Sequence, residues 1–222
     1  MLKVTRQTDP ELANLVDEEL SRQEHNIEMI ASESTAPLAV MELTGSVFTN
    51  KTLEGYPGAL GSIQLHTMAA KCWSFKYAAT DEFKAIMKQV VANAKCLANE
   101  LENYGFRIVS GGTDNHLLVA DLRNKKITGK DFQNALDAVG ITVNKNMIPF
   151  DPEKPFVTSG VRIGLTAVTQ RGLKEPEIKE IAAIMNAVAD APNDEENLAA
   201  CKAKAQALIA RFPLYPEGAF ED

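Results

Sequence analysis

The segments of this chain that favour β-strands are confined to one stretch of the sequence, and this order of elements limits the fold more than any other feature. Apolar runs between turn-forming residues predict strands over 106–110, 116–122 and 141–146, and the segment 157–165 is expected to be extended. Before and after this stretch, apolar residues recur at helical spacing. Helices on either side of a few strands, with one helix inserted among them, favour an α+β fold with helices layered on a small, mainly antiparallel sheet.

Residues that begin or end helices lie where the helical segments change. Asp9 offers a capping carboxylate before Pro10, Thr128 caps a later helix, and Gly45 is suited to a helix end. We expect helices over about 10–23, 37–44, 63–77, 81–104, 128–139, 175–189 and 194–211.

Glycine and proline are concentrated between residues 51 and 62, at Gly55, Pro57, Gly58 and Gly61. This density predicts that no regular element forms there. The segment is therefore the first seam in the chain.

Composition excludes several classes of protein. The 222 residues carry 23 Lys and Arg against 30 Asp and Glu, a formal net charge of −7, and 45% of them are hydrophobic. Such a chain folds rather than staying disordered, and it has no basic patch with interleaved aromatics for nucleic acid. No apolar run approaches the roughly 18 residues that cross a bilayer, and the first residues lack the apolar core of a signal peptide. Cys72, Cys96 and Cys201 lie far apart, which favours free thiols in a reducing cytoplasm.

Motifs for common chemistry are missing from the sequence. The three histidines are scattered, no cysteine pair has the spacing of zinc ligands, and no GxGxxG, GxxxxGK[ST] or GxSxG motif occurs. Arg162, in the string SGVRIG, can clamp a carboxylate with two hydrogen bonds, or it can form a structural ion pair.

Five strings of the sequence resemble serine hydroxymethyltransferase: HNIEMIASES, GSVFTNKTLEGYPG, SGGTDNHLLVADL, ITVNKNMIPFDPEKPFVTSGVRIG and AVTQRGLKEPEI. That family uses pyridoxal phosphate to move a one-carbon unit between serine and tetrahydrofolate. The resemblance covers nearly the whole chain. It implies the small C-terminal domain of a fold-type I pyridoxal-phosphate enzyme together with its helical N-terminal arm.

The resemblance also implies that a domain is missing. In the family, EGYPG precedes a large cofactor-binding domain that ends near the motif FPGxQGGPLxH, whereas here EGYPG runs directly into ALGSIQLH. We therefore expect an arm over 1–58 and a small domain over 59–222, with the large domain absent between Gly58 and Ala59. The Schiff-base lysine, the aspartate that pairs with the pyridine nitrogen and the histidine that stacks on the ring belong to that domain. Lys51 and Lys145 lie inside matched motifs but do not correspond to the missing lysine.

Four residues match positions of the family's active site. By resemblance, Ser32 and Arg162 hold the substrate carboxylate, Glu54 handles protons at the substrate hydroxyl and folate, and Asn146 contacts the pterin. Without an imine to orient, a carboxylate clamp binds weakly and catalyses nothing. We therefore interpret these residues as vestigial: Ser32 as a turn hydroxyl, Glu54 as a solvated turn residue and Asn146 as a strand-end amide.

Departures from the family pattern surround the former cofactor site. The family's QGGPL stands here as 60–64, where Gly61 is kept and Ser62 replaces the second glycine, which lies near the cofactor phosphate. Thr52 replaces a tyrosine, and Leu165 interrupts the family's GTPA. These changes put phosphate contact in doubt and favour deliberate redesign of a minimal domain.

The sequence therefore predicts a non-catalytic, engineered small domain that acts as a folding or oligomerisation scaffold, with no metal and no bound cofactor. Its partner is expected to be a second copy, joined through the N-terminal arm. Two alternatives remain: residual hydroxymethyltransferase or aldolase activity, by complementation with a large domain, and weak binding of folate or an amino acid.

Overall fold

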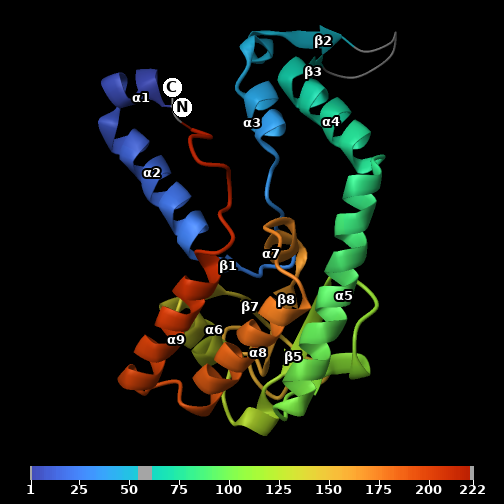
Figure 1. The fold of residues 1–222 in the computed structure, drawn as a ribbon, viewed down its shortest axis with the longest axis vertical. Coiled ribbons are helices and arrows are strands. Elements are labelled where there is room, and N and C mark those ends of the chain that lie inside the picture. Colours follow the sequence, from blue (N-terminus) through green and yellow to red (C-terminus); the bar gives the residue numbers. More distant parts are fainter. Residues whose placement is uncertain (1, 55–61, 221–222) are drawn as a thin grey trace. The chain divides into compact units, whose positions relative to one another are not determined.

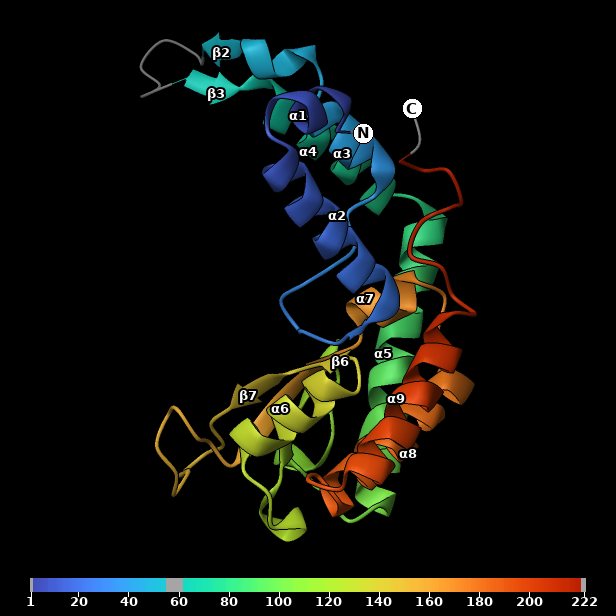
Figure 2. The same cartoon turned by 90° about the vertical axis from the view of Figure 1, so that its left-hand side faces the viewer.

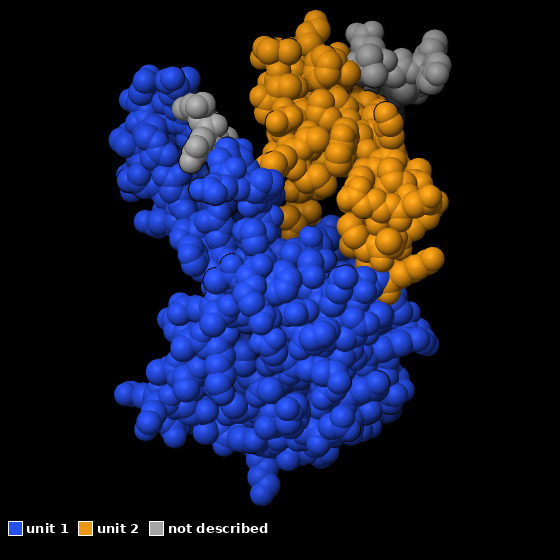
Figure 3. Space-filling model, in the orientation of Figure 1, with its two compact units in different colours: residues 1–33, 89–222 blue, residues 34–88 orange. Residues whose placement is uncertain are grey.

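The computed structural model describes residues 2–54 and 62–220. Two compact units make up the chain, one formed by residues 1–33 and 89–222 and the other by residues 34–88 (Figure 3). The boundary predicted between Gly58 and Ala59 lies outside the described residues and stays a prediction.

A four-stranded antiparallel sheet forms the centre of the first unit. Its strands, in spatial order, are β4 (Arg107–Ile108), β5 (Leu117–Asp121), β8 (Gly160–Gly164) and β7 (Asn144–Asn146). The strands predicted from the sequence are therefore found, and the α+β fold with a mainly antiparallel sheet is confirmed.

Helices bury one face of this sheet. Leu118, Ala120, Val161 and Ile163 alternate with more exposed residues and are at most 2% exposed. Helix α6 (Gly129–Ala138) contacts β7 and β8 and packs against α8 (Glu175–Asp190) and α9 (Glu195–Ile209). Helix α8 carries seven buried residues and lies beside α9 (Figure 1). The core of this unit is thus a layer of helices on one side of the sheet.

Capping side chains fix the helix ends where the sequence predicts them. The Asp9 carboxylate accepts from Leu12 N at the start of α2 (Pro10–His25), and the Thr128 hydroxyl accepts from Asp131 N at the start of α6. The Asp194 carboxylate does the same at the start of α9. Each cap satisfies a backbone donor that the first turn leaves unpaired.

The second unit is mainly helical. It contains α3 (Leu38–Thr44), a 3₁₀ turn (Val47–Asn50), α4 (Leu65–Ala78) and the first turns of α5 (Asp81–Asn103). Helices α3 and α4 pack against each other. Trp73 stacks on Tyr77 with ring centroids 5.2 Å apart, and Phe83 meets Tyr77 edge-on.

The prediction that residues 51–62 form no regular element is wrong. Strands β2 (Thr52–Glu54) and β3 (Ser62–Gln64) pair antiparallel, and α4 consequently begins at Leu65 rather than at Ile63. In the sequence, the glycines and prolines all lie between the two strands and not within them, so they do not prevent the residues on either side from pairing.

The single strand predicted over 141–146 is two strands. Its first part, β6 (Ile141–Thr142), pairs in parallel with β1 (Ile27–Glu28), whereas β7 pairs with β8. The segment changes partners because the N-terminal arm adds a strand at this point. Helix α1 (Lys3–Thr8) and α2 precede β1, so this pair ties the N-terminal helices to the rest of the first unit; Figure 2 shows both helices and β6.

Three short elements complete the fold. They are two 3₁₀ turns (Val109–Gly111 and Arg123–Lys125) and helix α7 (Thr166–Gln170). No helix among the described residues is long and apolar enough to cross a membrane.

Candidate functional site

Arg162 lies at the centre of the sheet face that the helices leave uncovered. Its neighbours in β8, Val161 and Ile163, are fully buried on the helical side, so the Arg162 side chain leaves the opposite face. Val119 of β5 and Asn144 of β7 flank it as register partners. The guanidinium is half-buried, and its Nε is shielded from water without a hydrogen-bond partner.

The Arg162 side chain forms no structural ion pair with the described residues, and its Nε has no hydrogen-bond partner among them. Within residues 2–54 and 62–220, the ion pairs of the sheet involve Arg107 and Arg123, both with Asp121, and none involves Arg162. A buried donor without an acceptor costs free energy, so such a group is typically satisfied by a ligand or by water.

Asn146 shares this sheet face with Arg162. It pairs with Gly160, two residues before Arg162 in β8, and is half-buried. Its Nδ2 donates to the carbonyl of Met147 at 2.6 Å, so the carbonyl end of the amide is the part left for another donor. The structure therefore brings Asn146 and Arg162 onto one face of the sheet.

Ser32 is held at the end of β8. The carbonyl of Met29 accepts from Gly164 N at 2.8 Å, and a Cβ built on Gly164 would lie only 2.9 Å from Ala31 N. The chain at Ala31 thus rests directly on Gly164, two residues after Arg162, and the next residue, Ser32, is an exposed turn residue.

His116, which the sequence analysis did not single out for this site, secures the turn. Its Nε2 lies 3.2 Å from the carbonyl oxygen of Ala31, while its own carbonyl accepts from Leu165 N at 2.9 Å. The ring therefore fastens the turn before Ser32 to the end of the sheet. Its position at the start of a predicted strand was the signal available in the sequence.

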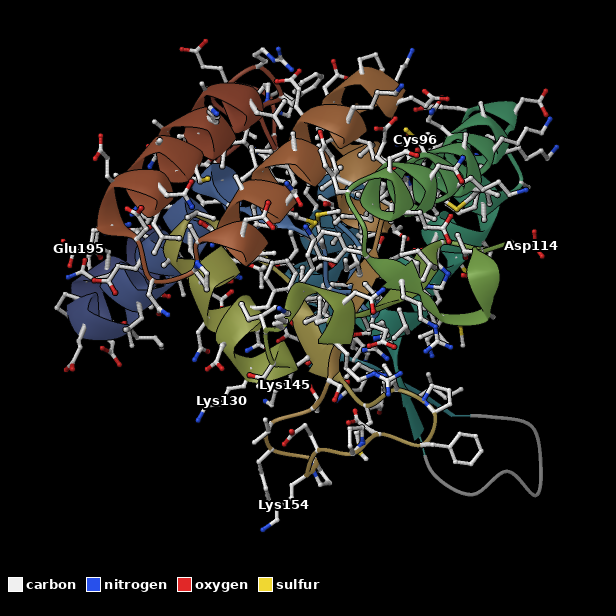
Figure 4. All side chains as sticks on the ribbon, turned by 90° about the horizontal axis from the view of Figure 1, so that it is seen from below. Cys96, Asp114, Lys130, Lys145, Lys154 and Glu195 are labelled. Atoms are coloured by element: carbon white, nitrogen blue, oxygen red, sulfur yellow. The ribbon has the colours of Figure 1, made fainter. Side chains whose placement is uncertain are left out.

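The loop that joins β7 to β8 is anchored by one carboxylate. Asp151 accepts hydrogen bonds from Ile148 N, Glu153 N, Ser159 N and Ser159 Oγ. Desolvation raises the pKa of Asp151, but these hydrogen bonds outweigh it and lower that pKa to about 2. The loop turns its outer end, with Lys154, away from the sheet (Figure 4).

Glu54 and Ser62 lie in the second unit, apart in sequence but opposite each other in the β2–β3 pair. Gly61 lies outside the described residues. The residues matched to the family's proton-handling glutamate and to its phosphate-binding glycine are thus register partners in a hairpin.

The sheet face around Arg162 does not fit pyridoxal phosphate. The cofactor needs a lysine on the same side as the substrate carboxylate, and the lysine found in the described strands of this sheet is Lys145. Lys145 pairs with Val161 and therefore alternates to the face opposite Arg162. No group of three or more His, Cys, Asp and Glu side chains in the described part of the chain could hold a metal ion.

Two comparisons with known proteins match this chain. The family model for serine hydroxymethyltransferase matches residues 5–60 and 58–185. A curated serine hydroxymethyltransferase from Myxococcus xanthus (strain DK1622) is 51% identical over 160 residues, which are 72% of this chain and 38% of that protein. The chain thus spans well under half the length of that relative. It belongs to the serine hydroxymethyltransferase family.

Proposed function

We propose that the chain is a stand-alone small domain of this family, without catalytic activity, that serves as a folding or oligomerisation scaffold. The observation that carries the proposal is the match to the family in two segments that meet at residues 58–60. Such a meeting point fits an internal loss of the large cofactor domain between Gly58 and Ala59.

The β2–β3 hairpin supports this proposal. Its register places Glu54 opposite Ser62, so the two motif ends that would flank a large domain are joined by residues 55–61 alone. The residues on either side therefore pair without an inserted domain between them. Together with the substitutions at Thr52 and Ser62, it favours an engineered origin.

The chemistry of the Arg162 face supports the lack of catalysis. A carboxylate clamp accelerates a reaction by placing a substrate against a reactive centre. With Lys145 on the other face, the residues around Arg162 supply binding and orientation but no nucleophile for an imine.

A rate comparison tests the proposal. Serine cleavage is measured with purified chain plus pyridoxal phosphate and with pyridoxal phosphate alone, each with tetrahydrofolate. We expect equal rates, and only scattered, low lysine labelling after borohydride reduction. A faster rate that one lysine substitution abolishes would refute the lack of catalysis. Equal rates that rise when a separate large domain is added would instead support the complementation alternative.

Retained binding of an amino-acid carboxylate is a second candidate function, favoured by the unpaired Nε of Arg162. Calorimetry with glycine or a reduced folate tests it. Binding at millimolar ligand that Arg162→Lys removes and Arg107→Lys leaves intact would support it, because Arg107 is an edge residue paired with Asp121. No heat with the unchanged chain would end it.

The arm supplies the proposed dimer contact. Apolar side chains on α1 and α2 are exposed in the isolated chain: Val4 by 70%, Leu12 by 49%, Leu15 by 56% and Val16 by 42%. Exposed apolar residues at helical spacing favour association with a second copy. We expect twice the chain mass in solution by light scattering, and a single-chain mass for Leu12→Glu/Leu15→Glu. A monomeric parent would contradict the dimer.

The free thiols of Cys72, Cys96 and Cys201 support a cytoplasmic location.

A further inference from the structure

Arg171 ties together three segments that are far apart in the sequence. It follows α7, and its guanidinium donates to the carbonyls of Glu24 at 2.7 Å, Gln23 at 3.1 Å and Asn26 at 3.1 Å. Its Nε donates to the carbonyl of Phe212 at 2.8 Å. All four acceptors are backbone carbonyls, three at the end of α2 and one after α9.

The three contacts to α2 satisfy carbonyls at the end of the helix. The last turn of a helix leaves carbonyls without intrahelical donors, and a cation placed there is favoured by the helix dipole. Burial lowers the pKa of Arg171 to about 10, in line with a guanidinium that has exchanged water for these carbonyls.

Beyond Phe212, the C-terminal segment runs back along α2 (Figure 1). A groove of about 580 Å³ is lined by Leu20 and Glu24 of α2 and by residues 213 and 215–220. Tyr215 and Phe220 meet edge-on, with ring centroids 4.9 Å apart, and burial raises the pKa of Tyr215. Tyr215 also lines a second cavity, together with Glu24 and Arg171.

We propose that residues 211–220 form a strap over α2 and that Arg171 couples closure of the strap to docking of the helix. The guanidinium is shared: when the strap opens, the Phe212 carbonyl leaves and water reaches Arg171, which weakens its bonds to Gln23, Glu24 and Asn26. When the end of α2 lifts, the same hydration weakens the bond to Phe212. Neither segment leaves without loosening the other.

Hydrogen exchange of the full-length chain, measured by mass spectrometry, tests this coupling. Tyr215→Ala/Phe220→Ala opens the strap without touching Arg171, and we expect amides near the end of α2 to exchange about tenfold faster, which corresponds to weakening of about one hydrogen bond to a charged group. Arg171→Lys should accelerate exchange in both α2 and the strap. Arg107→Gln is the matched control: this exposed arginine of β4 pairs with Asp121, outside both α2 and the strap, and its loss should leave α2 unchanged.

Combination of the variants decides between coupling and independence. With a shared guanidinium, the triple variant should exchange in α2 no faster than the more affected of the two parents, because both changes break the same set of bonds. Multiplied rates in the triple variant, or unchanged α2 exchange in the strap variant, would overturn the proposal. If Arg171→Lys does not fold, α2 exchange in Tyr215→Ala/Phe220→Ala still decides, because unchanged exchange in that variant overturns the proposal by itself.

Discussion

Replacement of Gly164 by alanine should detach the arm segment from the sheet. A Cβ at this position would lie 2.9 Å from Ala31 N, 3.0 Å from Ala31 Cβ and closer still to Ala31 Cα. Because the nearest atoms belong to the backbone, no rotamer change relieves the clash. Overpacking costs about 1–3 kcal/mol. Loss of the hydrogen bond from Gly164 N to Met29 O adds about 1 kcal/mol.

Thermal unfolding followed by far-UV circular dichroism measures the effect. A total of about 2–4 kcal/mol corresponds to a fall in Tm of roughly 4–16 °C for a chain of this size. In the double variant Gly164→Ala/Ala31→Gly, the contact with the Ala31 Cβ is removed, but residue 31 keeps its backbone N and Cα. The second substitution should therefore restore less than half of the lost free energy of unfolding. Gly45→Ala is the control: the nearest atom, Met41 O, is 3.6 Å away. A loss below about 0.5 kcal/mol for Gly164→Ala would refute the close packing of Ala31 on β8.

Two further substitutions test the polar groups of the first unit. Asn93 is fully buried, and its Nδ2 donates to the Thr169 hydroxyl and to the Leu173 carbonyl. Asn93→Ala should therefore lower the free energy of unfolding, measured in urea, by about 2–3 kcal/mol. Asn99 is exposed, and Asn99→Ala should not lower it. Because the folded-state pKa of Asp151 is depressed to about 2, its contribution is present above the unfolded pKa near 4 and disappears as the pH falls toward 2. Asp151→Asn should therefore lose less stability between pH 5 and 2 than the parent does, and equal losses would contradict the anchoring role.

Seven of the described helices were predictable because their signals are local, whereas the short helices α1 and α7 were not predicted. Asp9 and Pro10 fix the start of α2, and Asp194 fixes the start of α9, through hydrogen bonds that span only a few residues. The antiparallel sheet was also predictable, since the apolar alternation in β5 and β8 marks one buried face. Of the candidate site, Arg162 and Asn146 share a sheet face, but this depends on the register between β7 and β8, which the period of two within each strand does not fix.

Contacts between distant segments were not predictable from local pattern. Ile27 pairs with Ile141, which is more than a hundred residues away in the sequence. Strands of two residues are also too short to show the apolar alternation from which strands are predicted. His116 holds Ala31 through one ring nitrogen, a contact that no spacing rule encodes. The sequence does not predict the β2–β3 pair, because the many glycines and prolines of residues 55–61 make the whole segment 51–62 look like a loop.

The parallel pair of β1 with β6 has a consequence for how the chain is made. Residues 27–28 leave the ribosome long before residues 141–142, to which they bond. At synthesis rates of about 5–20 residues per second, roughly 6–23 s pass between the synthesis of β1 and that of its partner β6. During that interval, Ala13, Ile27 and Met29, which are buried in the folded chain, lack their later neighbours, so the nascent arm exposes apolar surface that the finished fold covers.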